Sequence, residues 1–254
     1  MQHKSIGIAV AAACAAALMG SPVAAAAASA SKGVVTMADP ASGARIRLQQ
    51  DKPGEVAIEV SDRQVTVRRQ LTPGRLQTDV TTASEKISFV LDPGGLAIST
   101  SRGKLRMSLT DPDAGRAAAQ LLGSSVALRR ASALLGRVKL GDSSPVTHTL
   151  LLTRAFLLAM AGQRDEAMAV VQQARATLQA VRIVRTRFGG GPDDCWNEYA
   201  REAIAAYKEL EDCMKNVAWY DIFGGAACTS IYDLRAIGAF SWYLSCVGLS
   251  GARS

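Results

Sequence analysis

The sequence is poor in histidine, and this shortage narrows the catalytic and metal chemistry that it can support. Only two of its 254 residues are histidines, His3 and His148. His3 stands in the first thirty residues, which are expected below to be removed, so a Ser-His or Cys-His nucleophile or a multi-histidine metal site would depend on His148 alone. The sequence also lacks a G-x-S-x-G nucleophile elbow, a Walker loop and a dinucleotide glycine fingerprint. We therefore expect a non-enzymatic protein with no catalytic residues, no cofactor and no metal.

One short motif and a group of carboxylates offer only weak alternatives. Ser101 and Lys104 match an S-x-x-K pattern, but they fall in an expected hairpin turn and not at the start of a helix. Glu198, Glu202 and Glu209 share one side of an expected helix and could divide acid and base roles. A solvated helix face explains these glutamates more simply, because basic residues stand close to them in the sequence. An enzyme that uses carboxylates is therefore the least favoured hypothesis.

Long hydrophobic runs are missing as well. The apolar run from 6 to 19 is too short to span a bilayer, and no later stretch is long enough. This run follows Lys4 and precedes an alanine-rich tract with a small-x-small cleavage site at 28–30 and an alternative at 24–26. We interpret residues 1–30 as a signal peptide. We expect a secreted or periplasmic protein that has no transmembrane anchor and begins near Ser31.

Cysteines are scarce before the last third of the chain, where four of them form a symmetric pattern. Two pairs with a spacing of eighteen residues are separated by a step of fifteen: Cys195, Cys213, Cys228 and Cys246. Eighteen residues make a whole number of helical turns, so each pair lies on one face of one helix, about 27 Å apart. A disulfide cannot close over that distance, and the four thiols cannot converge on one zinc ion. An antiparallel helical hairpin therefore predicts disulfides from Cys195 to Cys246 and from Cys213 to Cys228.

Aromatic residues are also rare until this segment, where they gather. The expected second helix, from 228 to 247, carries only Asp233 and Arg235 as charges, so one partner helix cannot cover its apolar surface. Trp and Tyr are favoured in interfaces. A candidate interaction surface is therefore expected from six residues: Trp196, Tyr199, Trp219, Tyr220, Trp242 and Tyr243. The core of a C-terminal module is the alternative role for the same residues.

The spacing of apolar residues changes near residue 110, and this change separates a region of expected strands from a region of expected helices. From 44 to 109 apolar and polar residues alternate between turn sequences, which predicts six or seven strands in an antiparallel meander buried on one face. From 111 to 187 alanine, leucine and arginine dominate, and helices are expected over 113–122, 124–137, 145–161 and 164–185. The predicted fold class is α+β, with an N-terminal antiparallel β-meander followed by an α-helical region ending in a disulfide-stapled antiparallel helical hairpin.

Four segments follow from these boundaries. A glycine run and Pro192 mark the last of them, because Pro192 stops a helix that arrives from upstream. The predicted segments are a signal peptide at 1–30, a β-meander domain at 31–110, a helical region at 111–188 and the stapled hairpin at 189–254.

Part of the helical region resembles a single tetratricopeptide unit, over residues 148–176. Small and apolar residues stand at the spacing of that repeat, with 163–166 as the turn between its helices: Ala155, Leu158, Gly162, Ala167, Val171 and Ala174. The resemblance implies a partner-binding surface. Such repeats need neighbours to bury their faces, and no second copy is evident, so an ordinary antiparallel helix pair is the alternative.

Charge is distributed unevenly along the chain, whose formal net charge is +7. Residues 31–191 hold 23 bases and 13 acids, whereas residues 192–254 hold nine acids and five bases. The basic part would suit anionic lipid head groups, cell-wall polymers or the acidic tail of the chain itself. An exported protein has little contact with nucleic acid, so we expect no nucleic-acid partner. Scattered solvated charge that aids solubility is the alternative explanation.

These features favour an exported, non-enzymatic binding or interaction protein. Its expected partner is an unknown protein or a cell-envelope component, and the sequence leaves its oligomeric state open. The alternative is a precursor that releases residues 192–254 as a secreted effector or antimicrobial module, which the basic run up to Arg187 and the following glycines would permit. The acidic charge of that piece argues against it, because membrane-active peptides are usually cationic.

Overall fold

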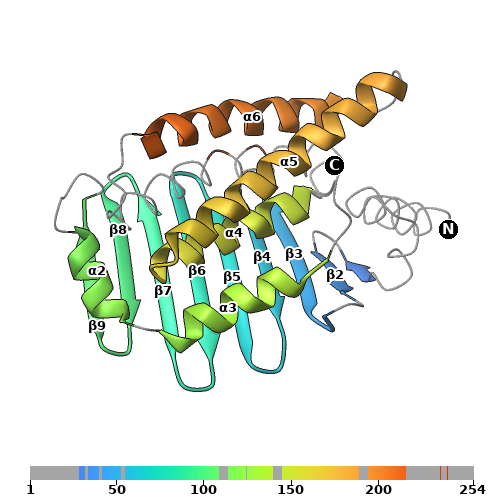
Figure 1. Ribbon diagram of the computed structural model, residues 1–254. Helices are drawn as coiled ribbons and strands as arrows, with labels where there is room; N and C mark the ends of the chain where they lie inside the picture. Colours follow the sequence, from blue (N-terminus) through green and yellow to red (C-terminus); the bar gives the residue numbers. More distant parts are fainter. Residues whose placement is uncertain are drawn as a thin grey trace.

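The structure, a computed structural model, combines a broad antiparallel sheet with helices that cover one of its faces (Figure 1). It describes residues 29–31, 34–39, 42–52, 55–108, 114–123, 125–139, 145–188 and 194–215, together with Arg235 and Ala239. Within these ranges the strands come first in the sequence and the helices follow.

The sheet is a meander in which the spatial order of the nine described strands is their order in the sequence. Every neighbouring pair is antiparallel. The strands are β1 (Ser29–Ser31), β2 (Val34–Ala38), β3 (Arg45–Lys52), β4 (Glu55–Ser61), β5 (Val65–Thr72), β6 (Arg75–Thr82), β7 (Lys86–Asp92), β8 (Gly95–Thr100) and β9 (Gly103–Met107). Local contacts of this kind need only short connections, which the Pro-Gly and Asp-rich turns supply.

Gly95 shows how strictly one of these turns depends on its residue type. Its φ is +117°, a conformation that side chains rarely adopt. A Cβ at this position would lie 2.1 Å from the carbonyl oxygen of Met107 on β9. The amide of Gly94 is held by the Asp92 carboxylate at 2.8 Å. The entry into β8 therefore requires glycine.

Alternation along each strand separates a buried face from an open one. In β5, for example, Val65, Val67, Arg69 and Leu71 are buried, whereas the residues between them are partly or fully exposed. Because successive side chains of a strand point to opposite faces, one face of the sheet is apolar and the other polar. This confirms the burial pattern expected from the hydrophobic period.

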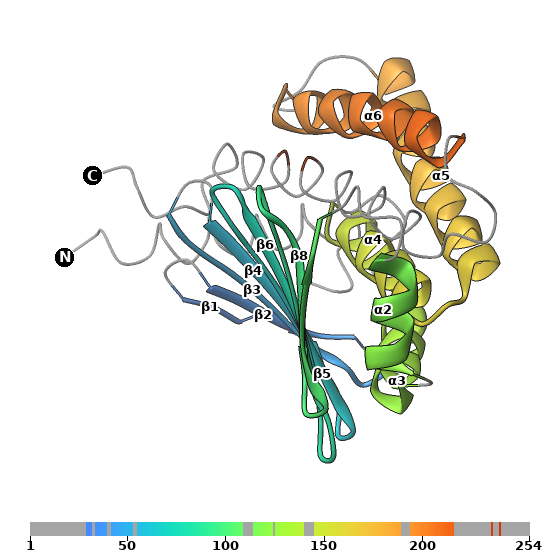
Figure 2. The ribbon, with the colours of Figure 1, turned by 90° about the vertical axis from the view of Figure 1, so that its left-hand side faces the viewer.

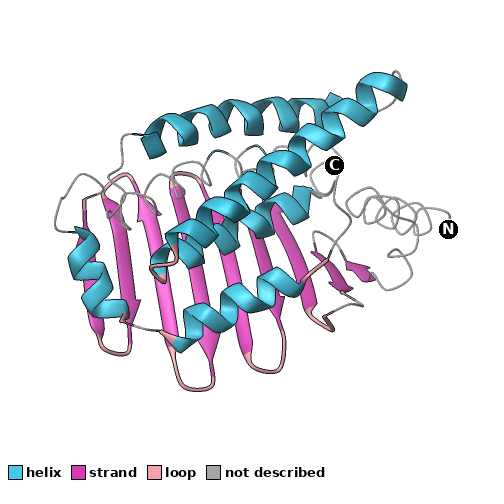
Figure 3. Ribbon diagram, viewed as in Figure 1, coloured by secondary structure: helices cyan, strands magenta, loops and turns pink. Residues whose placement is uncertain are grey.

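All described helices lie on the same side of the sheet, as the view turned by 90° shows (Figure 2). Figure 3 distinguishes the helices from the strands by colour. They are α2 (Ala114–Leu122), α3 (Val126–Arg137), α4 (Pro145–Met160), α5 (Arg164–Phe188) and α6 (Asp194–Lys215). Helix α2 packs beside β8 and β9, and α3 packs across β5 and β6. Helix α4 contacts α3 and α5, and α6 contacts α5. None of the helices in the described ranges is long and apolar enough to cross a membrane.

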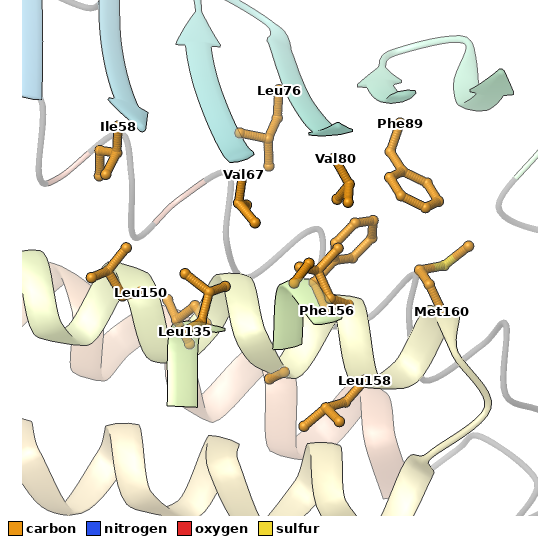
Figure 4. Packing of buried hydrophobic residues seen from close by; sticks show 14 of the residues in the cluster. Ile58, Val67, Leu76, Val80, Phe89, Leu135, Leu150, Phe156, Leu158 and Met160 are labelled. Carbon is orange, nitrogen blue, oxygen red and sulfur yellow. The ribbon is translucent and has the colours of Figure 1, made fainter. Parts of the chain in front are cut away.

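The hydrophobic core fills the space between the sheet and these helices (Figure 4). The rings of Phe89 on β7 and Phe156 on α4 meet edge to face, with centroids 5.2 Å apart. Arg69 also projects into this layer, and its guanidinium carbon lies 5.5 Å from the centroid of the Phe156 ring. Phe156 thus joins the sheet to the helical layer through one aromatic and one cation–π contact.

The expected order of a meander followed by helices agrees with the structure, and the α+β content is correct. The first four helices begin and end within three residues of their predicted bounds. The sheet is wider than the six or seven strands expected, because β1 and β2 precede the region in which strict alternation begins.

The last part of the predicted fold class is wrong. In the described ranges the C-terminal region contributes one helix, α6, and no stapled helical hairpin is shown. Helix α6 packs on α5, and its residues Tyr199, Ala203 and Leu210 are buried. The expected second helix from 228 to 247 lies outside the described residues except at Arg235 and Ala239.

Candidate interaction surfaces

His148, the one histidine expected in the mature chain, is fully buried on α4. Its Nδ1 lies 2.6 Å from the hydroxyl of Tyr199 on α6, within hydrogen-bond distance. The two rings meet edge to face, with centroids 6.0 Å apart. Burial lowers the pKa of His148 to about 3. The ring is therefore neutral near pH 7, and it ties α6 to α4.

Tyr199 accordingly does not contribute to an exposed surface in this structure, because its side chain is fully buried. Trp196 lies on α6, but its side chain is outside the described set, and so are four other residues of the predicted surface: Trp219, Tyr220, Trp242 and Tyr243. For Tyr199 the alternative role in a core is the one observed. The reason is that the apolar stripe of α6 packs on other helices of the body.

Cys195, in the first turn of α6, takes part in a disulfide bond. Its partner is not among the residues whose side chains the structure describes. Because Cys213 belongs to the same continuous helix, about 27 Å further along, it cannot be that partner. The predicted pairings of Cys195 with Cys246 and of Cys213 with Cys228 stay predictions.

The weak catalytic candidates occupy exposed positions. Ser101 lies in the connection between β8 and β9, as expected, and Lys104 is exposed on β9. On α6, Glu198 pairs with Arg201, and Glu209 pairs with Arg235. Within the described residues no group of three or more histidines, cysteines or carboxylates is placed to hold a metal ion.

The face of the sheet opposite the helices is broad and polar. None of the described helices covers it (Figure 2). Its most ordered feature is one cross-strand row, which we call the central row. It runs from β2 to β9 through directly paired residues: Thr36, Arg47, Glu59, Arg68, Asp79, Ser88, Ser99 and Lys104. From β3 to β6 the charges of this row alternate in sign, one strand spacing of about 4.8 Å apart.

Several neighbouring positions of this face are also polar, and some of their side chains are held in place by hydrogen bonds or ion pairs. On β6 the Gln77 amide donates to Asp79 at 2.9 Å, and Arg75 donates to Gln77 at 3.1 Å. At the far side of the sheet Arg106 on β9 pairs with Asp92 on β7 at 2.8 Å. Side chains fixed on strands form a more rigid array than side chains on loops. The face therefore presents an ordered pattern of charge.

Sequence reasoning missed this face as a candidate site. The sequence did indicate the polar face of each strand, because apolar and polar residues alternate along it. Arg47, Glu59, Arg68 and Asp79 stand at polar positions of this alternation. The row itself depends on register, which sets which residues of neighbouring strands stand opposite one another. Turn lengths in a meander restrict that register, so hairpin pairing could have indicated the row.

Comparison with protein families, with curated proteins and with solved structures gave no match for this chain.

Proposed function

We propose that the protein is an exported, non-enzymatic binding protein, and that the open face of its sheet docks a protein partner. The observation that carries this proposal is the central row, in which Arg47, Glu59, Arg68 and Asp79 alternate in sign across four neighbouring strands. Complementary charge patterns steer encounter and fix the register of protein complexes.

Alternation in sign also selects the kind of partner. A polyanion or an anionic membrane laid across the row would be attracted at Arg47 and Arg68 and repelled at Glu59 and Asp79. A protein surface that carries both signs can match every position. The open face therefore suits a folded protein better than a uniformly charged polymer.

The packing of α6 favours the intact chain over the precursor hypothesis. Release of residues 192–254 would separate Tyr199 from the buried His148 on α4. It would also separate Tyr207 from Arg175 on α5, whose guanidinium carbon lies 4.7 Å from the centroid of the Tyr207 ring. These contacts stabilise the association of α6 with the rest of the chain.

The test is site-specific photo-crosslinking of the protein in its own exported compartment. A photoreactive residue in place of Ser88, which belongs to the central row, is expected to yield one discrete adduct with a protein. The same residue in place of Ala133, which is exposed on α3, serves as the position control. An adduct at both positions, or at neither, would contradict docking on the open face.

A charge-reversal variant tests whether formation of the adduct depends on the charges of the central row. Arg68→Glu places three acids side by side with Glu59 and Asp79, and should abolish the adduct formed at position 88. Lys208→Glu makes the same change of charge on α6, outside both the central row and α3, and should leave that adduct intact. If both reversals reduced the adduct equally, the charge pattern of the row would have no role in recognition.

A further inference from the structure

One end of the sheet concentrates exposed bases, and this feature is separate from the open face. At that end lie the ends of β2, β4, β6 and β8 and the described residues that follow them, which are 39, 42–44, 61–65, 82–86 and 100–103 (Figure 1). Helix α3 spans the distance from 82–86 to 61–65 and is joined to both. We call this region, with Arg45 and with residues 125–139, the basic edge. Its eight bases are all exposed: Arg45, Arg63, Lys86, Arg102, Arg129, Arg130, Arg137 and Lys139.

The three acids of the basic edge are turned inward. Asp39 is fully buried and accepts a hydrogen bond from the Ser42 amide at 2.8 Å. Glu85 accepts from the hydroxyl of Ser125 at 3.0 Å, and Asp62 pairs with Arg137 at 2.9 Å. Among the eight bases only Arg137 forms an ion pair in the described part of the chain. The edge therefore presents an excess of positive charge to solvent.

The pKa of Asp62 also indicates that this carboxylate is held by local partners. Burial acts to raise the pKa of its carboxyl group, but the backbone amides of Gln64 and Val65 and the guanidinium of Arg137 together lower it below its usual value. Asp62 is therefore ionised at neutral pH and committed to local partners. Among the described residues its ion pair is with Arg137, and not with Arg63, Arg129 or Arg130.

The exposed side of α3 combines these charges with small and apolar residues. Exposed positions recur at helical spacing along one stripe: Val126, Arg129, Arg130, Ala133, Gly136 and Arg137. Val126 is 48% exposed, the one large hydrophobic side chain so exposed among those described. The opposite side of α3 supplies Leu128, Leu134 and Leu135 to the core, so the stripe is held in a fixed orientation.

We propose that the basic edge docks the protein on an anionic phospholipid surface. Bases of one sign extend from β3 to the β8–β9 connection, roughly 25 Å at the usual strand spacing. Such an array can contact several head groups at once, and arginine binds phosphate oxygens in a bidentate manner. The exposed Val126 and the small residues beside the arginines allow α3 to approach the head groups closely. This proposal is independent of the protein partner proposed for the open face.

The experiment is cosedimentation of the full mature protein, with its disulfides intact, with large vesicles of phosphatidylglycerol and phosphatidylcholine in equal parts. Binding is expected at low ionic strength, is expected to weaken as salt is raised, and is expected to be absent with vesicles of phosphatidylcholine alone. The double variant Arg129→Gln/Arg130→Gln should weaken binding by about tenfold or more. A second variant, Arg63→Gln/Arg102→Gln, tests the same edge away from α3.

The matched control is Arg75→Gln/Lys208→Gln, which removes the same charge from exposed positions on β6 and α6, outside the basic edge. It should bind the anionic vesicles like the wild type. Equal losses in the control and the edge variants would overturn the proposal, because net charge alone would then explain binding. Failure of the wild type to bind anionic vesicles, or equally tight binding of soluble polyphosphate that competes fully with the vesicles, would overturn it as well. Far-ultraviolet circular dichroism establishes that each variant is folded.

Discussion

At the scale of single residues, the buried His148 makes the stability of the fold dependent on pH. Its pKa is about 3 in the folded state and near 6.5 when the chain is unfolded. The unfolded state therefore binds more protons below pH 6.5, so this contribution is fully present above that pH and is lost as the pH falls toward 3. The neutral ring and Tyr199 form a polar contact that only the folded state provides.

The first prediction concerns this histidine. Because the mature chain is expected to contain no other histidine, its ring protons can be followed by NMR without ambiguity. No titration should occur between pH 8 and pH 5, and the histidine contribution to the free energy of unfolding should fall by about 2 kcal/mol between pH 7 and pH 5. Titration near pH 6.5 in the folded protein would show that the ring is exposed.

A second residue, Phe156, tests the packing between sheet and helices. Phe156→Ala should lower the free energy of unfolding by about 3–5 kcal/mol, because it removes the contact with Phe89 and leaves a cavity next to Arg69. Urea denaturation provides the measurement. Val126→Ala on the exposed stripe is the control and should change stability by less than about 1 kcal/mol. Similar effects of the two changes would place Phe156 outside the core.

Residue burial was predictable on the strands but less so on α6. Alternation in β5 indicated which side chains are inside, because period-two patterns follow directly from strand geometry. Tyr199 offered no such signal, since an aromatic residue on an apolar stripe suits a core and an interface equally well. Its contact with His148 joins positions 51 residues apart and depends on tertiary packing.

At the scale of elements, α3 is fastened to the sheet at both ends. Ser125 accepts a hydrogen bond from the Leu128 amide as the N-cap of α3, and its hydroxyl donates to Glu85 in the β6–β7 connection. At the other end Arg137 reaches Asp62 in the β4–β5 connection. The helix starts and stops were largely readable from the sequence, because caps and glycine breaks are local signals. The attachment of the helix to particular turns was not.

A third prediction follows from this cap. Ser125→Ala should destabilise the protein by about 1–2 kcal/mol, since it removes both a capping interaction and a partner of the partly buried Glu85. Thermal or urea unfolding gives the value. Ser84→Ala, at an exposed position of the same β6–β7 connection, should have almost no effect. A neutral Ser125→Ala would mean that the hydroxyl contributes nothing to the attachment of α3.

The expected cleavage of the signal peptide falls within β1, the N-terminal edge strand of the sheet. Strand β1 includes Ser29 and Ala30, which the expected cleavage after residue 30 would remove. Strand β2 would then be the edge, and the remaining eight strands keep their pairing because each pairs only with its neighbours in the sequence. The sheet therefore tolerates the expected processing.

At the scale of the whole molecule, one layer of helices and one open polar sheet face divide the surface into regions of different charge. The alternating central row and the basic edge lie on the same framework but suit partners of different chemistry. The α+β class and the element order could be predicted from periodicity. The predicted terminal hairpin could not be distinguished from a helix docked on the body, because spacing on one helix says nothing about which element covers its apolar face.

The proposed function assigns the exported protein an uncleaved chain, in which α6 stays joined to the body through Tyr199 and His148. The most direct test is the mass of the mature protein in the exported fraction. We predict one species of about 24 kDa, which is the 26.7 kDa of the full chain less its first thirty residues. A C-terminal fragment of about 7 kDa as the main exported product would contradict the account, because α6 would then function apart from the sheet.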